Sequence, residues 1–175
     1  MKRFFLPITL AGIILLAFSS CEELLDKIGV TINSDYTDID FTVNPDKAGT
    51  YMETVEIVDS DLDSLIEAEG QDIGELNSVK IKDAMIQVMG EGNLDPFESF
   101  LFTIEAPGKE IIKIAEVTEV PAGLTEIPLT KGEVDLSDYL KSDQYTIKVK
   151  TVLDQDLETQ MNMRARVRFE IKVGL

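Results

Sequence analysis

Apolar and polar residues alternate along most of the chain, which is the pattern of strands with one buried face. The clearest example runs from Met161 to Val173, where seven apolar residues alternate with six polar ones. A shorter example runs from Tyr145 to Lys150, and the polar segment Asp154 to Thr159 separates the two. Together these segments predict an antiparallel hairpin with a long loop and a long second strand.

Earlier segments show the same alternation over shorter lengths. The segment from Ile39 to Val43 alternates in this way, and the next places Tyr51, Val55 and Ile57 at alternate positions. Each set of apolar residues predicts the buried face of a strand.

Two further features interrupt the alternation in ways that predict specific geometry. Between Val79 and Met89 the apolar positions change parity at Lys82-Asp83, which predicts a β-bulge. The segments Phe97 to Glu105 and Ile111 to Val117 flank a turn signal at Ala106 to Lys109, so they predict a second hairpin.

Only two stretches favour helix. The segment from Asp59 to Glu69 has Leu62, Leu65 and Ile66 at helical spacing, and the segment behind Asp135 repeats this arrangement over about one turn. Both look like short crossovers between strands. The whole pattern predicts an all-β fold, an antiparallel β-sandwich of the Ig-like or jelly-roll kind with about eight strands and one or two short helices.

The first residues carry a targeting pattern. Lys2 and Arg3 precede an apolar run from Phe4 to Phe18, and Ser19 and Ser20 separate that run from Cys21, the only cysteine. The run is short for a membrane-spanning helix, which needs about 20 residues, and suits the apolar region of a signal peptide. An ordinary cleaved signal peptide or an N-terminal anchor helix is the alternative interpretation.

This junction resembles a bacterial lipoprotein signal peptide, in which the cysteine becomes the acylated first residue of the mature protein. Phe18 stands where that family usually has Leu. Glu22-Glu23 directly after the cysteine resembles the export signal of surface lipoproteins in the Bacteroidota. The resemblance implies a signal peptide over 1–20 and a lipidated Cys21. Together with the strand pattern, it predicts a tether over 21–29 and a β-sandwich domain over 30–175.

The composition removes several kinds of chemistry. The chain has no His and a single Cys, so His-based catalysis, His- or thiolate-ligated metals and internal disulfides are excluded within it. Phosphate-binding Gly-rich loops and Ser-nucleophile motifs are also absent from the sequence. We therefore expect no catalysis and no cofactor. A hydrolase that uses a pair of carboxylates is a minor alternative.

The charge balance is strongly acidic. The chain has 33 acids against 16 bases, a net charge of −17. Without 1–20, which carry two bases and no acid, the net charge is −19. Bare nucleic acid is therefore excluded as a partner, because phosphate binding needs a dominant positive field.

A row of basic residues on the predicted C-terminal hairpin is the first candidate site. If that hairpin forms, one of its faces carries Lys148, Lys150, Arg164, Arg166 and Arg168. One interpretation is an anion-binding face for acidic polysaccharide or for lipid A-type phosphates. The other is that acids of the first half, such as Asp38, Asp40 or Glu53, lie on a neighbouring strand and neutralise it, since like charges across strands are destabilising.

An acidic run is the second candidate. Asp59, Asp61 and Asp63 resemble the first half of a calcium loop, but Ser64 and Gly70 stand where an EF-hand has Gly and Glu. The alternative is a short helix whose acids favour its N-terminus. Aromatic residues give no clear sugar platform, because Phe97, Phe100 and Phe102 are expected in the core and the chain has no Trp.

Taken together, the signal, the acidic start and the strand pattern resemble uncharacterised β-sandwich lipoproteins of the Bacteroidota. The resemblance implies an outer-membrane lipoprotein, surface-exposed or facing the periplasm, attached to the membrane through Cys21. We expect a binding or structural module without catalysis, with an envelope protein or a glycan as partner. The alternative is a carbohydrate-binding or polysaccharide-handling accessory lipoprotein.

Overall fold

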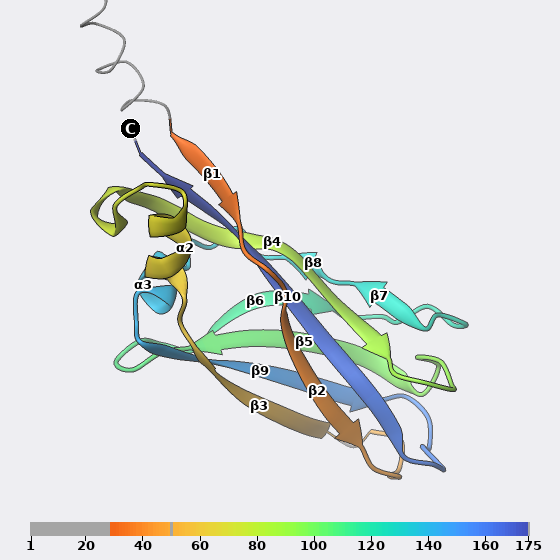
Figure 1. Ribbon diagram of the computed structural model, residues 1–175. Helices are drawn as coiled ribbons and strands as arrows, with labels where there is room; N and C mark the ends of the chain where they lie inside the picture. Colours follow the sequence, from red (N-terminus) through yellow and green to blue (C-terminus); the bar gives the residue numbers. More distant parts are fainter. Residues whose placement is uncertain (1–28, 50, 175) are drawn as a thin grey trace, which may run out of the picture.

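Two antiparallel sheets pack face to face in this protein (Figure 1). The computed structural model describes residues 29–49 and 51–174. The sandwich, with its short helices, confirms the all-β fold that the alternating pattern predicts. The predicted signal peptide, Cys21 and all of the tether except Gly29 lie outside the described residues.

The first sheet is organised around its longest strand and is called the β10 sheet. Its order is β1-β10-β4-β7, and β2 also pairs with β10. β1 lies along the end of β10 at Glu170–Val173, and β2 lies along the stretch from Met161 to Val167, so both occupy the same edge. The strands are β1 (Val30–Asn33), β2 (Thr37–Val43), β4 (Leu76–Val88), β7 (Glu126–Pro128) and β10 (Met161–Val173).

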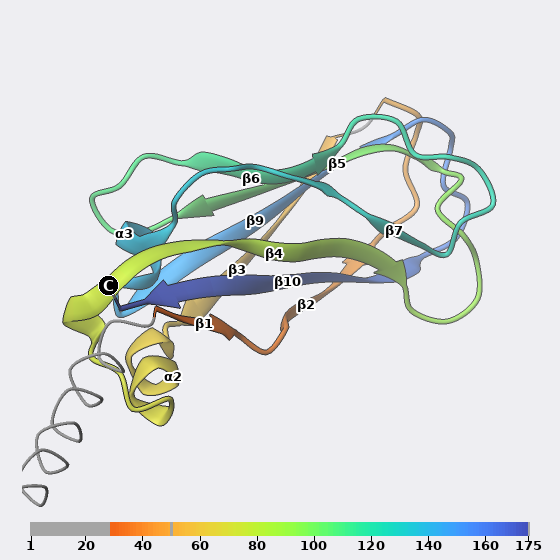
Figure 2. The same cartoon turned by 90° about the horizontal axis from the view of Figure 1, so that it is seen from above.

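The second sheet, called the β9 sheet, has the order β3-β9-β5-β6-β8. β5 and β6 form the predicted hairpin around the turn at 106–111. The strands are β3 (Tyr51–Asp59), β5 (Phe97–Glu105), β6 (Ile112–Val117), β8 (Thr130–Lys131) and β9 (Gln144–Leu153). Seen from above, β4 and β10 run along one side of the sandwich and β5 and β6 along the other (Figure 2).

The inner faces of the two sheets form one apolar core. Phe97, Phe100 and Phe102 are almost fully buried there, as the sequence predicts. Across the core, the rings of Tyr145 from β9 and Phe169 from β10 meet edge to face, with centroids 6.2 Å apart. This aromatic contact therefore joins an inner strand of one sheet to an inner strand of the other.

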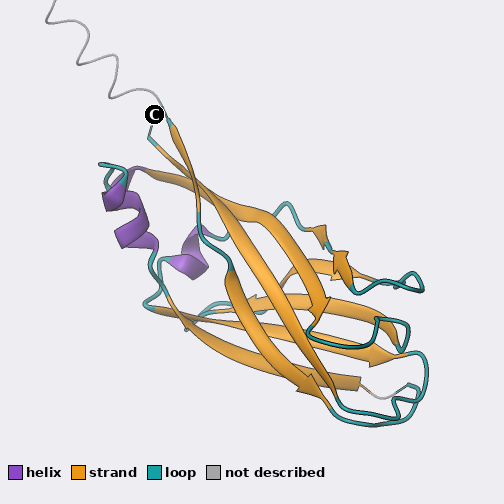
Figure 3. Cartoon of the chain, turned by 45° about the vertical axis from the view of Figure 1, so that its right-hand side comes forward, coloured by secondary structure: helices purple, strands orange, loops and turns teal. Residues whose placement is uncertain are grey.

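Both predicted helices are present at one end of the sandwich, called the helical end (Figure 3). α2 (Leu62–Ala68) buries Leu62 and Ile66, and a 3-10 helix (Ile73–Glu75) leads into β4. α3 (Ser137–Leu140) begins behind Asp135, whose carboxylate accepts hydrogen bonds of 3.0 Å from two backbone N–H groups, those of Ser137 and Val79. The loops at 89–96, 118–125 and 154–160 gather at the opposite end, called the loop end (Figure 2).

The predicted bulge is confirmed in β4. Arg168 of β10 pairs with Asp83, and the next residue, Phe169, pairs with Ile81, so Lys82 is the extra residue. The insertion keeps Ile81 and Ala84 on the buried face although their positions differ in parity.

The predicted hairpin between β9 and β10 is wrong. The two strands belong to different sheets, and the segment 154–160 crosses from one sheet to the other. Alternation shows that each strand has a buried face, but two strands facing each other across a core produce the same pattern as two strands side by side. The basic residues of β9 and β10 therefore lie on opposite outer faces of the sandwich.

The predicted inward face of β3 is also wrong. Val55 and Ile57 are 50% and 65% exposed, because they share the outer face with Lys148 and Thr146 of β9. The half-buried side of β3 is instead that of Thr54 and Val58.

Candidate functional site

The basic residues of β10 lie on the outer face of the β10 sheet, between acidic residues on both neighbouring strands. Arg164 and Arg166 are paired in register with Asp40 and Asp38 of β2. On the other side, Arg168 is paired in register with Asp83 of β4. These residues are called the charged face: Asp38, Asp40, Asp83, Arg164, Arg166 and Arg168.

The β2 half of the charged face is held by short ion pairs. Arg164 binds Asp40 through two parallel hydrogen bonds, Nε to Oδ1 at 2.5 Å and Nη2 to Oδ2 at 2.7 Å. Arg166 donates from Nε to Oδ1 of Asp38 at 2.8 Å, and Arg164 Nη1 lies 3.5 Å from the same carboxylate. The hydrogen bonds from Arg164 lower the pKa of the Asp40 carboxyl below its ordinary value and raise the pKa of Arg164.

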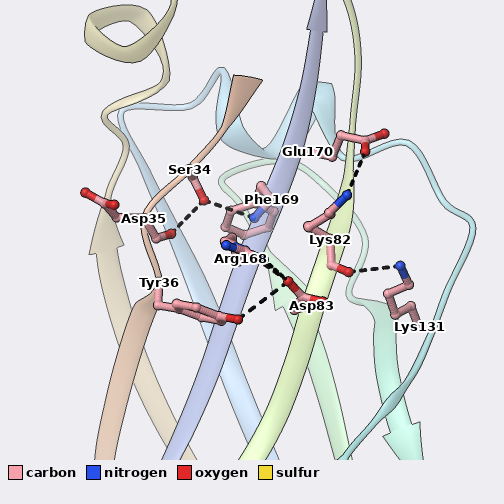
Figure 4. Close-up of polar contacts among 9 residues, drawn as sticks. All are labelled: Ser34, Asp35, Tyr36, Lys82, Asp83, Lys131, Arg168, Phe169 and Glu170. Atoms are coloured by element: carbon pink, nitrogen blue, oxygen red, sulfur yellow. Dashed lines mark hydrogen bonds and ion pairs between the residues drawn. The ribbon is translucent and has the colours of Figure 1, made fainter. Parts of the chain in front are cut away.

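The β4 half of the charged face is built around an aromatic ring. The Cζ atoms of Arg166 and Arg168 lie 4.5 and 4.8 Å from the centroid of the Tyr36 ring, which is cation–π distance. The Tyr36 hydroxyl donates to Oδ2 of Asp83 at 3.5 Å, and Arg168 Nε donates to the same oxygen at 3.0 Å (Figure 4). The hydrogen bond to Asp83 raises the pKa of Arg168.

Tyr36 is placed by the break between β1 and β2. The Ser34 N–H donates to the carbonyl oxygen of Phe169 at 3.0 Å, and the Ser34 Oγ accepts from the Phe169 N–H at 3.0 Å. This double contact fixes the chain to β10 just before it enters β2 (Figure 4). Sequence reasoning missed Tyr36 and Asp83. Tyr36 could have been found from its spacing, because it stands two residues before Asp38 and four before Asp40 and therefore shares their face of the strand.

Two lysines, Lys82 at the bulge and Lys131 of β8, line a cavity of about 290 Å³ on the outer surface. Lys82 Nζ is 3.4 Å from Oε2 of Glu170, and Lys131 of β8 donates from Nζ to the carbonyl oxygen of Lys82 at 2.9 Å (Figure 4). Met85 and Pro128 add apolar surface to this cavity. The Glu170 carboxylate thus pairs with Lys82, and the Asp83 carboxylate pairs with Arg168.

The lysines of β9 lie on the other outer face of the sandwich. Lys148 Nζ is 2.7 Å from Oε2 of Glu105, and Lys150 Nζ is 3.6 Å from Oε2 of Glu53. The structure therefore does not bring the five basic candidates together. Each of them faces a carboxylate, and three of those carboxylates are the expected Asp38, Asp40 and Glu53, so the charged rows are neutralised rather than open to an anion.

The structure does not assemble Asp59, Asp61 and Asp63 into a metal site. Asp59 ends β3 and accepts a hydrogen bond of 2.7 Å from Gln144 Nε2, while Asp63 lies in the first turn of α2. Within residues 29–49 and 51–174, no group of three potential ligands is placed to hold a metal ion. The acids around α2 fit the alternative interpretation, a short helix with negative charge at its N-terminus.

Comparison with known proteins gives no family. No family model matches the chain, and no curated protein matches it. Among solved structures, a chain from Desmodium yellow mottle tymovirus matches with 10% identity over 99% of this chain and 96% of that one, at a TM-score of 0.23. That score is too low to assign a fold or a function. In the part of the chain that the structure describes, no helix has both the length and the apolar character to cross a membrane.

Proposed function

We propose that this protein is a lipid-anchored binding or structural module of a bacterial cell envelope, without catalysis. Acylation of Cys21 supplies the membrane attachment, and the β-sandwich supplies the surface that meets other envelope components. The outer membrane is its location, with the domain on the external or the periplasmic side.

The observation that carries this proposal is where the chain enters the domain. Val30 pairs with Val173, so the first and last strands begin and end together at the helical end (Figure 1). The described chain therefore enters the domain at that end, and the loop end lies at the far side of the sandwich. A tether attached in this way holds the domain at a membrane with its loops directed outward.

The physical logic of the anchor follows from the surface of the domain. The described surface is acidic, and most of its basic residues are engaged in ion pairs. Such a surface has little affinity for an anionic membrane, so attachment needs acyl chains. Each buried CH₂ contributes about 0.8 kcal/mol, and two or more chains make attachment stable.

The charged face supports a structural role better than sugar recognition. Tyr36 is the aromatic ring of that face, and Arg166 and Arg168 both lie within cation–π distance of it. A sugar ring stacks on an open aromatic surface, and the two guanidinium groups compete for this one. The carbohydrate-handling alternative would therefore need a different surface.

Fatty-acid labelling tests the proposal. The full chain is expressed in a bacterium that processes lipoproteins, in the presence of an alkyne-tagged palmitate, and compared with Cys21→Ala. We expect the natural chain to carry the label and to lack its leader, and we expect the Cys21→Ala variant to lose the label and to retain the leader, as measured by the mass of the intact chain. Equal labelling of the two chains, or an unmodified Cys21 thiol in the natural chain, would overturn the proposal.

A further inference from the structure

One edge of the β9 sheet is a strand with a partner on one side only. β3 pairs with β9 along its whole length, from Tyr51 to Asp59. In the described part of the chain, no strand pairs with its other side, and β3 forms the outer margin of its sheet (Figure 1). An edge of this kind presents backbone donors and acceptors to a further strand.

The ladder identifies which backbone groups point outward. The Ser60 N–H donates to the carbonyl oxygen of Asp143 at 2.8 Å, in the same register as the rest of the β3–β9 pair. In an antiparallel pair, residues alternate between those that exchange hydrogen bonds with the partner and those that direct these groups away. Thr54, Glu56 and Val58 therefore bond to β9, and Val55 and Ile57 direct their N–H and C=O groups outward.

The same two residues expose apolar side chains. Val55 is 50% exposed and Ile57 65% exposed, and they are next to each other on the outer face of β3. The strand thus combines outward backbone groups with an apolar surface at the same positions. Natural edge strands usually carry Lys, Pro or a bulge to prevent further pairing. The sequence of β3 contains neither Lys nor Pro, and its register with β9 is unbroken.

Glu56 lies between these residues on the opposite face of the strand and restricts what can pair there. It is exposed at the sheet margin, next to Ile147 on β9. A partner strand with an apolar or acidic residue opposite Glu56 would leave a charge uncompensated at a close cross-strand position.

A second copy of the chain is a poor occupant for this reason. If Val55 of one copy paired with Ile57 of another, the two Glu56 side chains would lie opposite each other. If Val55 paired with Val55, Glu56 would lie opposite Thr54, which carries no charge. The net charge of −17 adds general repulsion between copies.

We propose that the free edge of β3 binds an extended segment of a partner protein in which a Lys or Arg stands between two β-branched apolar residues. The apolar residues pair with Val55 and Ile57 on the outer face, and the basic residue pairs with Glu56. Backbone hydrogen bonds provide affinity and the alternating side chains provide selectivity, which is the mode of β-strand addition. This inference names the partner class of the proposed binding module and does not depend on the lipid.

A peptide titration tests the proposal. The full chain in detergent is titrated against a fluorescein-labelled peptide that alternates valine and lysine, with fluorescence anisotropy as the readout. We expect saturable binding that is absent for a peptide alternating valine and glutamate. Absence of binding by the lysine peptide at low salt would overturn the proposal.

Proline substitution separates strand addition from general charge attraction. In Val55→Pro the lost N–H points away from β9, so the internal ladder is retained, as proline on an edge strand allows. We expect about tenfold weaker peptide binding. Ile111→Lys, which changes an exposed apolar residue outside β3, is the control and should bind within about twofold of the natural chain.

Two further measurements cover the case in which Val55→Pro does not fold. A peptide with N-methyl groups on the amides that would face β3 should lose binding without any change in the protein. Glu56→Lys should reverse the preference toward the valine–glutamate peptide. Undiminished binding of the N-methylated peptide, or an unchanged preference in Glu56→Lys, would contradict the proposal. The Cys21 labelling experiment is independent of all these results.

Discussion

The Nε–H group of Arg168 donates a hydrogen bond of 3.0 Å to Oδ2 of Asp83, directly across the ladder between β10 and β4. Asp83 is the residue after the bulged Lys82, so the ion pair sits where the strand carries its extra residue. The bulge leaves Lys82 outside the regular alternation, with Ile81 and Ala84 buried on either side of it. The position of the bulge therefore predicts which single residues of β4 can be deleted without loss of the fold.

Deleting Lys82 should preserve the fold. Without it, Ile81, Asp83 and Ala84 follow each other in regular inward and outward alternation, and Arg168 still faces Asp83. We expect a folded protein with a melting temperature a few degrees from that of the natural chain, by circular dichroism.

Deleting Met85 is the matched control. Met85 lies in the regular part of β4, so its loss would turn Ile86 and Val88 from the core to the solvent side. We expect this variant not to fold. If the two deletions were equally harmful, the bulge would not be the reason for the parity change.

Removing the acids of β2 should create anion binding that the natural chain lacks. In an Asp38→Asn/Asp40→Asn double variant, Arg164 and Arg166 lose their carboxylate partners while the hydrogen-bonding amide remains. We expect stronger retention on a heparin column, because the guanidinium groups of Arg164 and Arg166 no longer face a carboxylate. This retention should decrease as the salt concentration rises. A Glu67→Gln/Glu69→Gln variant changes the net charge equally and should elute with the natural chain.

Stability should fall at alkaline pH through one buried tyrosine. Burial raises the pKa of Tyr145 to about 12, although a hydrogen bond with Thr37 acts in the opposite direction. The folded state therefore favours the neutral phenol. The contribution of this phenol to the unfolding free energy is fully present below pH 10, the ordinary pKa of tyrosine, and is lost between about pH 10 and 12. The loss amounts to about 3 kcal/mol of unfolding free energy.

Denaturant unfolding between pH 9 and 12 measures this effect against Tyr145→Phe. The phenyl ring keeps the contact with Phe169 and has no proton to lose. The difference in unfolding free energy between the two proteins should therefore shrink or reverse as the pH rises. A constant difference over this range would contradict the prediction.

Replacing Thr151 by Val should stabilise the protein. Thr151 is 2% exposed on the inner face of β9, and its Oγ1 has no hydrogen-bond partner. A buried hydroxyl without a partner costs about 1–3 kcal/mol, so we expect a gain of about 1 kcal/mol in unfolding free energy. Thr146→Val changes a half-buried residue on the outer side of the same strand and should have a much smaller effect.

Sequence reasoning succeeded where a physical pattern was local. The alternation from Met161 to Val173 coincides with β10, the parity change marks the bulge at Lys82, and helical spacing locates α2. Each of these depends on residues close together in the chain. β1, β7 and β8, with two to four residues each, are too short to show a period.

The failures concern relationships between distant segments. Whether β9 and β10 lie side by side or face each other depends on the route of the segment 154–160, which alternation does not encode. On the edge strand β3, the register with β9 places Val55 and Ile57 on the outer face, opposite Lys148 and Thr146, and alternation alone does not show which face is the inner one. For the charged face, complementary charge was enough to predict Asp38 and Asp40 as partners of the arginines. The roles of Asp83 and Tyr36 could be found only from the register of β4 and β2 against β10.

The position of β10 in the order of strands has a consequence for biogenesis. β1, β2 and β4 all take their ladder partner from β10, which follows every other strand in the chain. While the polypeptide is being synthesised, this sheet cannot close until 161–173 have left the ribosome. Up to that moment the β9 sheet, whose strands all precede β10, lacks the layer that covers its inner face.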